Sequence, residues 1–412
     1  MQIPYKKSKI VLSLILLFIS FQLITTAQSN NNFRYLNNAI KIKAGENIQA
    51  YVDKHPDGTV FKIEKGVYHE QSVSPKNGNI FIGKEGVIMD GNLKTMYAFS
   101  GNANDVVIDG FEIMNYGPAT LPDGKGSFDG AINAVSRNSD QDKSARWTVR
   151  NCNVHNNQLC GIFLCDGGQI INNKIHHNRQ MGVKLYYANS GLVEGNEIAF
   201  NNNMDEDNTT KGHFDRYWES GGTKFAWTNN LVVKNNYVHD NDGPGLWTDI
   251  DNVNTLYQNN LVEDNSGIGI FHEISYSAVI RNNVVRRNGN INRGWLWEAG
   301  ILIAASSDVE VYNNIVEDNF NGITGILQNR GSGKHGARTL DNVYIHDNTI
   351  VVSANQKNGF VQEDNPDLFE RNIIIENNSY TSKDNTPLLF GWDNKLDLTY
   401  TEWLKFHPKD KK

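Results

Sequence analysis

Apolar and polar positions alternate along this chain with a long-range period that asparagine marks. Apolar residues, mostly Val and Ile, stand three residues before and two residues after one column of Asn, and a second Asn column lies five residues later. The first column is Asn173, Asn196, Asn236, Asn260, Asn283, Asn314 and Asn348, and the second is Asn178, Asn201, Asn241, Asn265, Asn288 and Asn319. With Cys152 counted as a member of the first column, the shortest spacings are 21, 23 and 24 residues. This period is typical of a coil of short strands and not of a helical hairpin.

The pattern predicts an all-β fold, a right-handed parallel β-helix with about ten or more coils and an Asn ladder. β-Branched residues at alternate positions bury one face of a short strand, and Asn tolerates the left-handed backbone that a tight corner requires. Stacked Asn amides can then hydrogen-bond from coil to coil. The alternative is a disordered low-complexity segment, but such a segment has no reason to keep Val and Ile in register with Asn.

The N-terminus has the features of an export signal. Lys6, Lys7 and Lys9 precede the apolar run 10–24, and small residues suited to cleavage follow the run. The run is shorter than the roughly 20 residues that a membrane-spanning helix needs. We therefore predict a signal peptide over residues 1–27, a secreted or periplasmic protein and no stable insertion into the membrane.

The rest of the chain is predicted to be one domain. A solenoid grows by adding coils, and no Pro/Ser-rich linker or charge run divides residues 28–412. We expect the N-terminal cap and the first coils at about residues 33–100, where the Asn ladder is absent. Wider spacings predict loops that bulge from a coil at 118–146, 204–220 and 289–298.

Charge and cysteine content exclude some classes of function. The formal net charge is −7, and removal of the signal peptide with its three Lys makes it −10. A nucleic-acid partner is not expected, because no basic stripe is present. Cys152, Cys160 and Cys165 are an odd number in an exported chain, so a disulfide framework is not expected, and their spacing does not indicate zinc. We expect a monomer.

Candidate chemistry lies where the repeat departs from its pattern. The strands that follow the second Asn column start at Gly161, Gly182, Gly222, Gly245, Gly269, Gly300 and Gly325. The residue after Gly is apolar in most of these strands and should face inward, so the second and fourth residues after Gly should face outward. In four consecutive coils these outward positions are Lys184, Tyr186, Lys224, Ala226, Trp247, Asp249, Phe271 and Glu273. Because coils stack at about 4.8 Å, these side chains should form one patch.

The composition of this patch predicts a carbohydrate site. Trp247 offers a flat apolar face to a sugar ring, and Asp249 and Glu273 supply two carboxylates. Asp251 is a third candidate carboxylate. The residues expected to bind substrate are Lys184, Tyr186, Lys224, Trp247, Phe271, Trp218 and Glu219. For any single residue a solvated ion pair is the simpler explanation, but exposed Trp and Phe beside paired acids have no folding rationale.

Two residues behind the patch are expected to support it. His272 falls on the inward column, which is more often the place of a core histidine than of a catalyst. Thr248, on the adjacent coil, is its expected hydrogen-bond partner. We expect Asp215 and Glu219, in the loop before Gly221, to be the next candidates if the carboxylate pair fails.

The chain resembles the pectate-lyase-like superfamily of secreted right-handed β-helix proteins. The coil repeat carries the resemblance over the mature chain, together with the segments 218–225, 245–252 and 269–275. The resemblance implies activity on carbohydrate, because the superfamily includes polysaccharide lyases, glycoside hydrolases such as polygalacturonases, and uronate epimerases. The chain lacks the Asp-Asp, Gly-His-Gly and Arg-Ile-Lys pattern of polygalacturonases and the Asp-Pro-His-Glu run of alginate epimerases. Neither specific activity therefore transfers, and function must rest on the site.

Three functions remain open. The leading hypothesis is a glycoside hydrolase without a required cofactor, in which Asp249 and Glu273 are the acid and its partner and repulsion raises the pKa of one. The second is a polysaccharide lyase or uronate epimerase. In that case Lys224 or Lys184 abstracts a proton while Asp249, Asp251 and Glu273 hold Ca²⁺. The third is a glycan-binding surface protein without catalysis.

Overall fold

The computed structural model describes residues 38–118, 129–134, 144–202, 214–290, 294–353, 356–363, 371–383 and 385–410. The predicted signal peptide, residues 1–27, lies outside the described residues. In the described part of the chain, no helix has the length and apolar character that a membrane-spanning helix requires.

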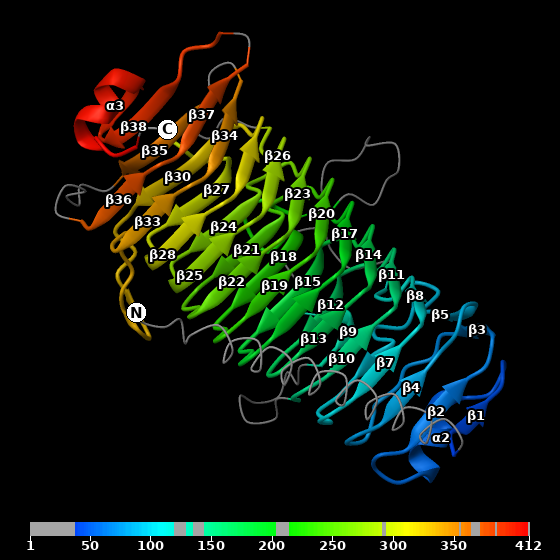
Figure 1. The fold of residues 1–412 in the computed structure, drawn as a ribbon. Coiled ribbons are helices and arrows are strands. Elements are labelled where there is room, and N and C mark those ends of the chain that lie inside the picture. The colour runs from blue at the N-terminus through cyan, green and yellow to red at the C-terminus, as the bar shows by residue number, and fades with distance from the viewer. Residues whose placement is uncertain are drawn as a thin grey trace, which may run out of the picture.

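Three long parallel sheets wind around one elongated core, so the prediction of a parallel β-helix is confirmed (Figure 1). Thirteen strands form sheet A, and twelve strands form each of sheets B and C. Sheet A contains β1 (Ile40–Ile42), β2 (Val60–Ile63), β4 (Ile80–Ile82), β7 (Val107–Asp109), β10 (Thr148–Arg150), β13 (Gln169–Ile171), β16 (Leu192–Glu194), β19 (Val232–Lys234), β22 (Thr255–Gln258), β25 (Tyr276–Arg281), β28 (Ser307–Tyr312), β33 (Val343–His346) and β36 (Ile373–Glu376).

Sheets B and C complete each coil. Sheet B contains β3 (Gly66–His69), β5 (Val87–Asp90), β8 (Glu112–Met114), β11 (Asn153–His155), β14 (Lys174–His176), β17 (Glu197–Ala199), β20 (Tyr237–His239), β23 (Leu261–Glu263), β26 (Val284–Arg286), β29 (Ile315–Glu317), β34 (Thr349–Val352) and β37 (Ser379–Ser382). Sheet C contains β6 (Phe99–Ser100), β9 (Gly130–Asn133), β12 (Cys160–Leu164), β15 (Met181–Tyr186), β18 (Gly221–Ala226), β21 (Leu246–Asp249), β24 (Ile270–Glu273), β27 (Ala299–Ala304), β30 (Asn321–Leu327), β35 (Lys357–Gln362), β38 (Leu389–Asp393) and β39 (Lys395–Thr399).

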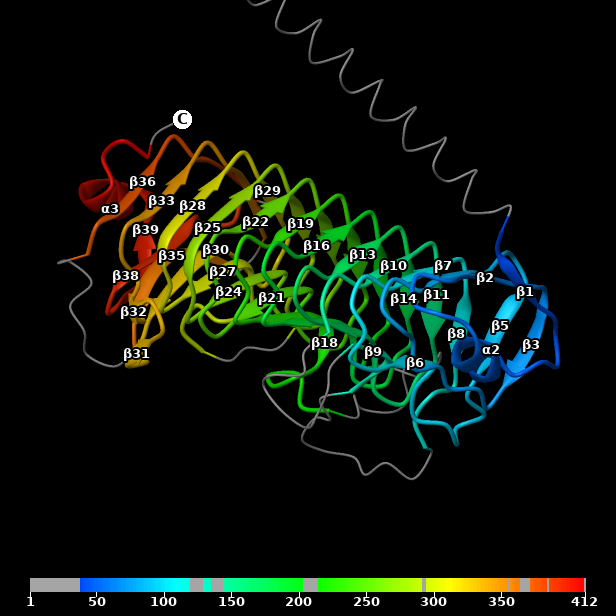
Figure 2. The ribbon, with the colours of Figure 1, turned by 90° about the horizontal axis from the view of Figure 1, so that it is seen from below.

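Short elements stand at the ends and on one side of the coil stack. Helix α2 (Ile48–Lys54) places Ile48 and Val52 in the first part of the core. At the other end β39 pairs with β38 in the antiparallel direction, and α3 (Tyr400–Phe406) follows. An antiparallel hairpin of β31 (Ser332–Gly333) and β32 (Gly336–Ala337) projects from the C-terminal half of the body in Figure 2.

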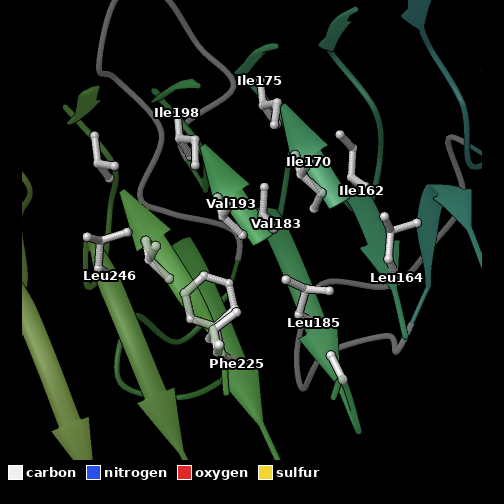
Figure 3. Packing of buried hydrophobic residues seen from close by; sticks show 14 of the residues in the cluster. Ile162, Leu164, Ile170, Ile175, Val183, Leu185, Val193, Ile198, Phe225 and Leu246 are labelled. Carbon is white, nitrogen blue, oxygen red and sulfur yellow. The ribbon is translucent and has the colours of Figure 1, made fainter. Parts of the chain in front are cut away.

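Inward-facing aliphatic side chains fill the space between the sheets. Figure 3 shows Ile162, Val183 and Phe225 of sheet C meeting residues of the other two sheets, such as Val193 and Ile198. All five side chains are fully buried. The alternation expected from the sequence is therefore the alternation that builds the core.

The predicted Asn ladder is present, and two adjacent asparagines have different roles at each of several corners. At a typical rung, Asn260 Nδ2 donates to Asn283 Oδ1 at 2.9 Å and to Val233 O at 3.0 Å. The residue before it, Asn259, takes the left-handed backbone at φ 55°. Asn282 and Asn313 do the same one and two coils further along, at φ 56° and 54°. The first Asn of each pair therefore turns the corner, and the second makes the ladder.

The ladder ends on a residue of another kind. Asn348 donates to Asn378 Oδ1, and Asn378 donates its backbone N–H and its Nδ2 to Asp410 Oδ1 at 3.1 and 3.0 Å. The other oxygen of Asp410 accepts from Tyr380 and Trp403, both at 2.8 Å. A buried carboxylate thus closes the first column.

One predicted strand start is wrong. The sequence pattern aligns Gly325 with Gly300, but Gly325 pairs in register with Ile303, because Ile301 pairs with Ile323. Gly322 therefore stands beside Gly300. The coil is shorter there than in its neighbours, so the apolar run after Gly325 suggests an alignment that is three residues late.

Candidate active site

Sheet C brings the predicted patch together. In the strand register, Lys184 pairs with Lys224, Trp247 with Phe271, and Asp249 with Glu273. Thr248 also lies beside Phe225, which places Trp247 next to Lys224 on the outer face. The Lys224 ammonium stands 3.8 Å from the centre of the Trp247 ring. The outward positions of four coils therefore form one continuous row of contacts.

The expectation that Trp247 and Phe271 are exposed is wrong. They are 3% and 4% exposed and stack on each other, with ring centres 5.4 Å apart. They belong to a second apolar cluster with Leu296 and the partly buried Trp297, which the end of the predicted loop 289–298 folds over them. A sugar ring cannot lie on Trp247 in this arrangement, and the two aromatic rings instead wall the carboxylate site.

Glu219 is the centre of a buried ion cluster. Its carboxylate lies 3.0 Å from Lys184 Nζ and 3.2 Å from Lys224 Nζ, and it accepts from the Tyr186 hydroxyl at 2.7 and 2.8 Å. Gln180 Nε2 donates to the Glu219 carbonyl at 2.8 Å. The backbone of Glu219 is left-handed at φ 52°, as it is at many corners of this coil stack.

The cluster fixes the charge of each group in it. Burial alone would raise the pKa of Glu219, but Lys184, Lys224 and the Tyr186 hydroxyl lower this pKa to about 2. Burial and the Glu219 charge raise the pKa of Tyr186 well above its ordinary value. Burial would lower the pKa of Lys184, yet Cys160 and Glu219 raise it. Near neutral pH the carboxylate is therefore ionised, Lys184 is charged and Tyr186 is a neutral donor.

Asp249 and Glu273 differ in environment although they are neighbours. Asp249 Oδ2 forms an ion pair with Lys224 Nζ at 2.9 Å. Glu273 accepts from Trp247 Nε1 at 3.2 Å and from Arg330 Nη1 at 2.9 Å. Burial raises the pKa of Glu273, the charge of Asp249 raises it further, and Arg330 lowers it by less. The side chains are 11% and 10% exposed, so both reach the edge of the buried cluster.

Arg330 is a site residue that the sequence analysis missed. It follows β30 and contacts Glu273 across 57 positions of sequence. Arg330 also donates to Gln328 Oε1 at 3.1 Å, and Gln328 donates to Glu363 at 2.7 Å. Glu363 in turn accepts from Trp297 Nε1 at 2.6 Å. No local sequence pattern predicts the contact of Arg330 with Glu273, because this contact depends on the path that the chain takes after β30.

Asp251 does not join the other two carboxylates. Its Oδ1 accepts from Arg338 at 3.1 and 3.2 Å, and its Oδ2 accepts from the backbone N–H of Lys334 at 3.2 Å. Residues 330–338, which we call the arm, therefore lie across the corner of sheet C and are tied to Asp251. In the part of the chain that the structure describes, no group of three or more His, Cys, Asp or Glu is arranged to hold a metal ion.

His272 and Thr248 lie behind the carboxylates as expected. Both are fully buried, and Thr248 Oγ1 lies 2.7 Å from His272 Nδ1. Burial lowers the pKa of His272 to about 3, so the ring is neutral. The Tyr257 hydroxyl donates to Thr248 at 3.1 Å. This group fills the core under the site and does not reach substrate.

The loop before Gly221 supplies the remaining predicted residues. Trp218 is 41% exposed and is adjacent in sequence to Glu219. Of the four aromatic residues predicted to bind substrate, Trp218 is therefore the one with a substantially exposed side chain. Asp215 is engaged within its own loop, where its Oδ1 accepts from the Tyr217 N–H at 2.9 Å.

Comparisons with known proteins agree on the fold. Residues 133–316 match the family described as "Right handed beta helix region". The A-module of mannuronan C-5 epimerase AlgE4 from Azotobacter vinelandii is similar, with a TM-score of 0.55 and 16% identity, covering 84% of this chain and 94% of the module. The AlgE6 A-module from the same organism has a TM-score of 0.58 and 17% identity, covering 84% of this chain and 93% of the module. The structure of XylC with xylose has a TM-score of 0.56 and 12% identity, covering 85% of this chain and 87% of XylC. A search against curated protein sequences found no match. These similarities establish a right-handed parallel β-helix.

Proposed function

We propose that this protein is a carbohydrate-active enzyme that hydrolyses glycosidic bonds, with Glu273 as the acid and Asp249 as its ionised partner. The observation that carries this proposal is the unequal environment of the two carboxylates. Asp249 has the Lys224 cation at 2.9 Å, whereas burial and Asp249 raise the pKa of Glu273. A carboxyl group of raised pKa beside a carboxylate that is held in an ion pair is what an acid and its partner require.

The proposed reaction follows from these two charge states. Protonated Glu273 donates its proton to the glycosidic oxygen as the bond to the leaving sugar breaks. Ionised Asp249 attacks the anomeric carbon, and a water that gives its proton to Glu273 then cleaves the glycosyl–Asp249 ester. In the alternative, Asp249 takes a proton from a water that attacks the anomeric carbon directly. Neighbouring coils stand about 4.8 Å apart, close to the roughly 5 Å separation of carboxylates in retaining enzymes. We therefore expect the anomeric configuration to be retained.

The ion cluster around Glu219 supports the pair from the other side. Lys224 contacts both Glu219 and Asp249, so Glu219 holds in place the cation that pairs with Asp249. Trp218, the accessible aromatic side chain next to Glu219, offers a face for a sugar ring. The substrate would then extend along the exposed rim of sheet C, from Trp218 toward Arg330.

The lyase or epimerase alternative has one observation in its favour, the fold shared with mannuronan C-5 epimerase modules. The geometry of the site supports the lyase or epimerase alternative less well than it supports hydrolysis. A proton-abstracting lysine must be neutral, whereas Lys224 lies between the Glu219 and Asp249 carboxylates at 3.2 and 2.9 Å. The Ca²⁺ version also needs Asp251 beside Asp249 and Glu273, and the Asp251 carboxylate is bound to Arg338 instead.

One experiment tests the proposal. Residues 28–412 are incubated with a panel of neutral and acidic polysaccharides, with and without a chelator, and with the Glu273→Gln variant as control. New reducing ends without the ultraviolet absorbance of an unsaturated uronate, lost in Glu273→Gln, support hydrolysis. Chelator-sensitive absorbance would instead support a lyase, and a change in uronate configuration without chain cleavage an epimerase. Binding without any product would support a glycan-binding protein.

A further inference from the structure

A surface hollow lies away from the carboxylate pair, at the corner where sheet C passes into sheet A. Its volume is about 450 Å³, within the size range of small-molecule sites. The coil corners contribute Tyr276, Ser307, Asp308 and Asp341, and the segment after β31 contributes His335 and Thr339. The arm that carries Arg330 to Glu273 is therefore also one wall of this hollow.

The wall is fixed in place by specific contacts. The Tyr276 hydroxyl donates to the carbonyl of Gly336 at 2.9 Å. The Tyr276 ring meets His335 edge to face, with ring centres 5.4 Å apart. On the other side of the arm, Arg338 and the backbone of Lys334 bind the Asp251 carboxylate. The hollow is thus built from four coils and a tethered hairpin.

Hydrogen-bonding groups converge on the hollow from different elements. Asp308 and Asp341 lie on adjacent coils, and the Asp308 N–H donates to the carbonyl of Asp341 at 3.0 Å. Asp341 uses Oδ1 for two backbone N–H groups, both at 2.8 Å. Asp341 Oδ2 receives no hydrogen bond from the described residues. Thr339 Oγ1 is buried and has no hydrogen-bond partner among the described residues. A buried hydroxyl without a partner is uncommon and calls for a ligand or water.

We propose that this hollow is a second saccharide-binding site that takes a neutral sugar residue. Sugar hydroxyls can donate to the Asp308 and Asp341 carboxylates and can bond to Thr339, while the exposed His335 ring, held by the buried Tyr276 ring, supplies apolar surface. Two carboxylates without a lysine or arginine among the lining residues repel an anionic sugar. The site therefore selects against uronates, whichever bond the catalytic pair acts on.

Direct binding of simple glycosides tests the site. The probes are the methyl glycosides of xylose, mannose and galactose, with methyl glucuronide as the charged comparison. Binding is measured by calorimetric titration and by saturation-transfer NMR on the protein carrying Asp249→Asn and Glu273→Gln. At least one neutral glycoside should bind, and methyl glucuronide should bind at least about tenfold more weakly.

Matched substitutions on the hairpin locate the binding. Ala337→Trp places a bulky side chain at a lining residue and should weaken binding at least about tenfold. Ser332→Trp is the control, because Ser332 is the exposed register partner of Ala337 and does not line the hollow.

Equal binding to both variants, preference for the glucuronide, or binding by no neutral glycoside would overturn the proposal. If such binding is found but the parent protein never turns over a polysaccharide, the catalytic proposal fails and this site stands. Turnover without such binding supports the catalytic proposal and overturns this site.

Discussion

Asp249 and Glu273 occupy the same register position on neighbouring strands of sheet C, yet each has its own cationic partner. Asp249 is paired with Lys224 at 2.9 Å, on the N-terminal side of the site. Glu273 is paired with Arg330 at 2.9 Å, on a segment that returns from the C-terminal side. The pair therefore stands where two separate polar networks meet, and its two charges can be altered one at a time.

Removing one carboxylate charge at a time tests the pair itself. Asp249→Asn and Glu273→Gln should each lower kcat by a factor of at least about 100 while the fold remains, because acid–base groups contribute roughly 10² to 10⁴. The double variant should lose little more than the worse single variant, since both groups act in one transition state. Asp251→Asn is the matched control, because its carboxylate faces Arg338, and it should reduce kcat much less. Single variants with the turnover of the parent would remove this site assignment.

Replacing Arg330 should move the pH profile in a defined direction. Arg330 lowers the pKa of Glu273, so Arg330→Met should raise that pKa. Glu273 acts in its protonated form, and activity falls as pH rises through its pKa, so the alkaline limb of kcat/KM should move to higher pH. Arg338→Met, which removes the cation from Asp251, is the comparison. An alkaline limb that stays in place or moves to lower pH would contradict the acid role of Glu273.

Lys224→Ala separates hydrolysis from proton abstraction. A hydrolase uses Lys224 to position Asp249 and substrate, so KM should rise more than kcat falls. A lyase or epimerase would lose all turnover while still binding substrate. Lys234→Ala, on the outer face of β19 and paired with Glu194, shows the effect of losing an ion-paired lysine that lies outside the site. Steady-state kinetics with a direct binding measurement distinguish the two outcomes.

Glu219→Gln should destabilise the protein. It leaves Lys184 and Lys224 buried without their shared carboxylate, and breaking a buried ion pair costs roughly 3–5 kcal/mol. The folded-state pKa of Glu219 is about 2 against an ordinary 4.5. Its stabilisation is therefore complete above about pH 4.5 and is lost as pH falls toward 2, so the difference between parent and variant should shrink over that window.

Chemical denaturation at several pH values measures this difference. The control is Glu70→Gln, whose partner Lys94 lies 2.8 Å away with side chains 42% and 69% exposed, and it should destabilise the protein far less than Glu219→Gln. Equal losses for the two variants would mean that the Glu219 cluster is not a stabilising unit.

Asn260→Leu tests the ladder. Asn260 accepts from Asn236 and donates to Asn283 and to Val233 O, all at 2.9 to 3.1 Å. Its loss should lower the free energy of unfolding by about 1–3 kcal/mol without changing activity per folded molecule. Lys174→Leu, at a side chain that is 69% exposed, provides the surface comparison. An unchanged melting temperature in Asn260→Leu would mean that this rung contributes nothing.

The fold could be predicted because its signals are local and repeated. From Asn173 to Asn348, successive coils contain Asn at a fixed place between apolar, mostly β-branched residues, so the neighbouring coils support the alignment of each one. Gly325 shows the limit of this rule. In a shortened coil the apolar pattern allows two alignments, and only pairing with β27 decides between them.

The sequence pattern predicts which strands carry the candidate site, but it does not predict the contacts that other segments make with those strands. Alternation predicts the outward direction of Lys184, Lys224, Asp249 and Glu273. Exposure could not be read in the same way, because Leu296 and Trp297 cover Trp247 from a segment outside the repeat. The contacts of Arg330 with Glu273 and of Arg338 with Asp251 span 57 and 87 positions. Neither contact has a local sequence signal.

Asp410 ends the first Asn column at the C-terminal end of the coil stack. From Asn173 to Asn378, each Asn of the first column donates to the next member of the column, so a column that ended in Asn would present unpaired donors. Asp410 accepts those donors and has no side-chain amide to pass on. With α3 and the antiparallel β39 at the same end, the first column, as far as the structure describes it, offers no free amide on which a second copy could stack.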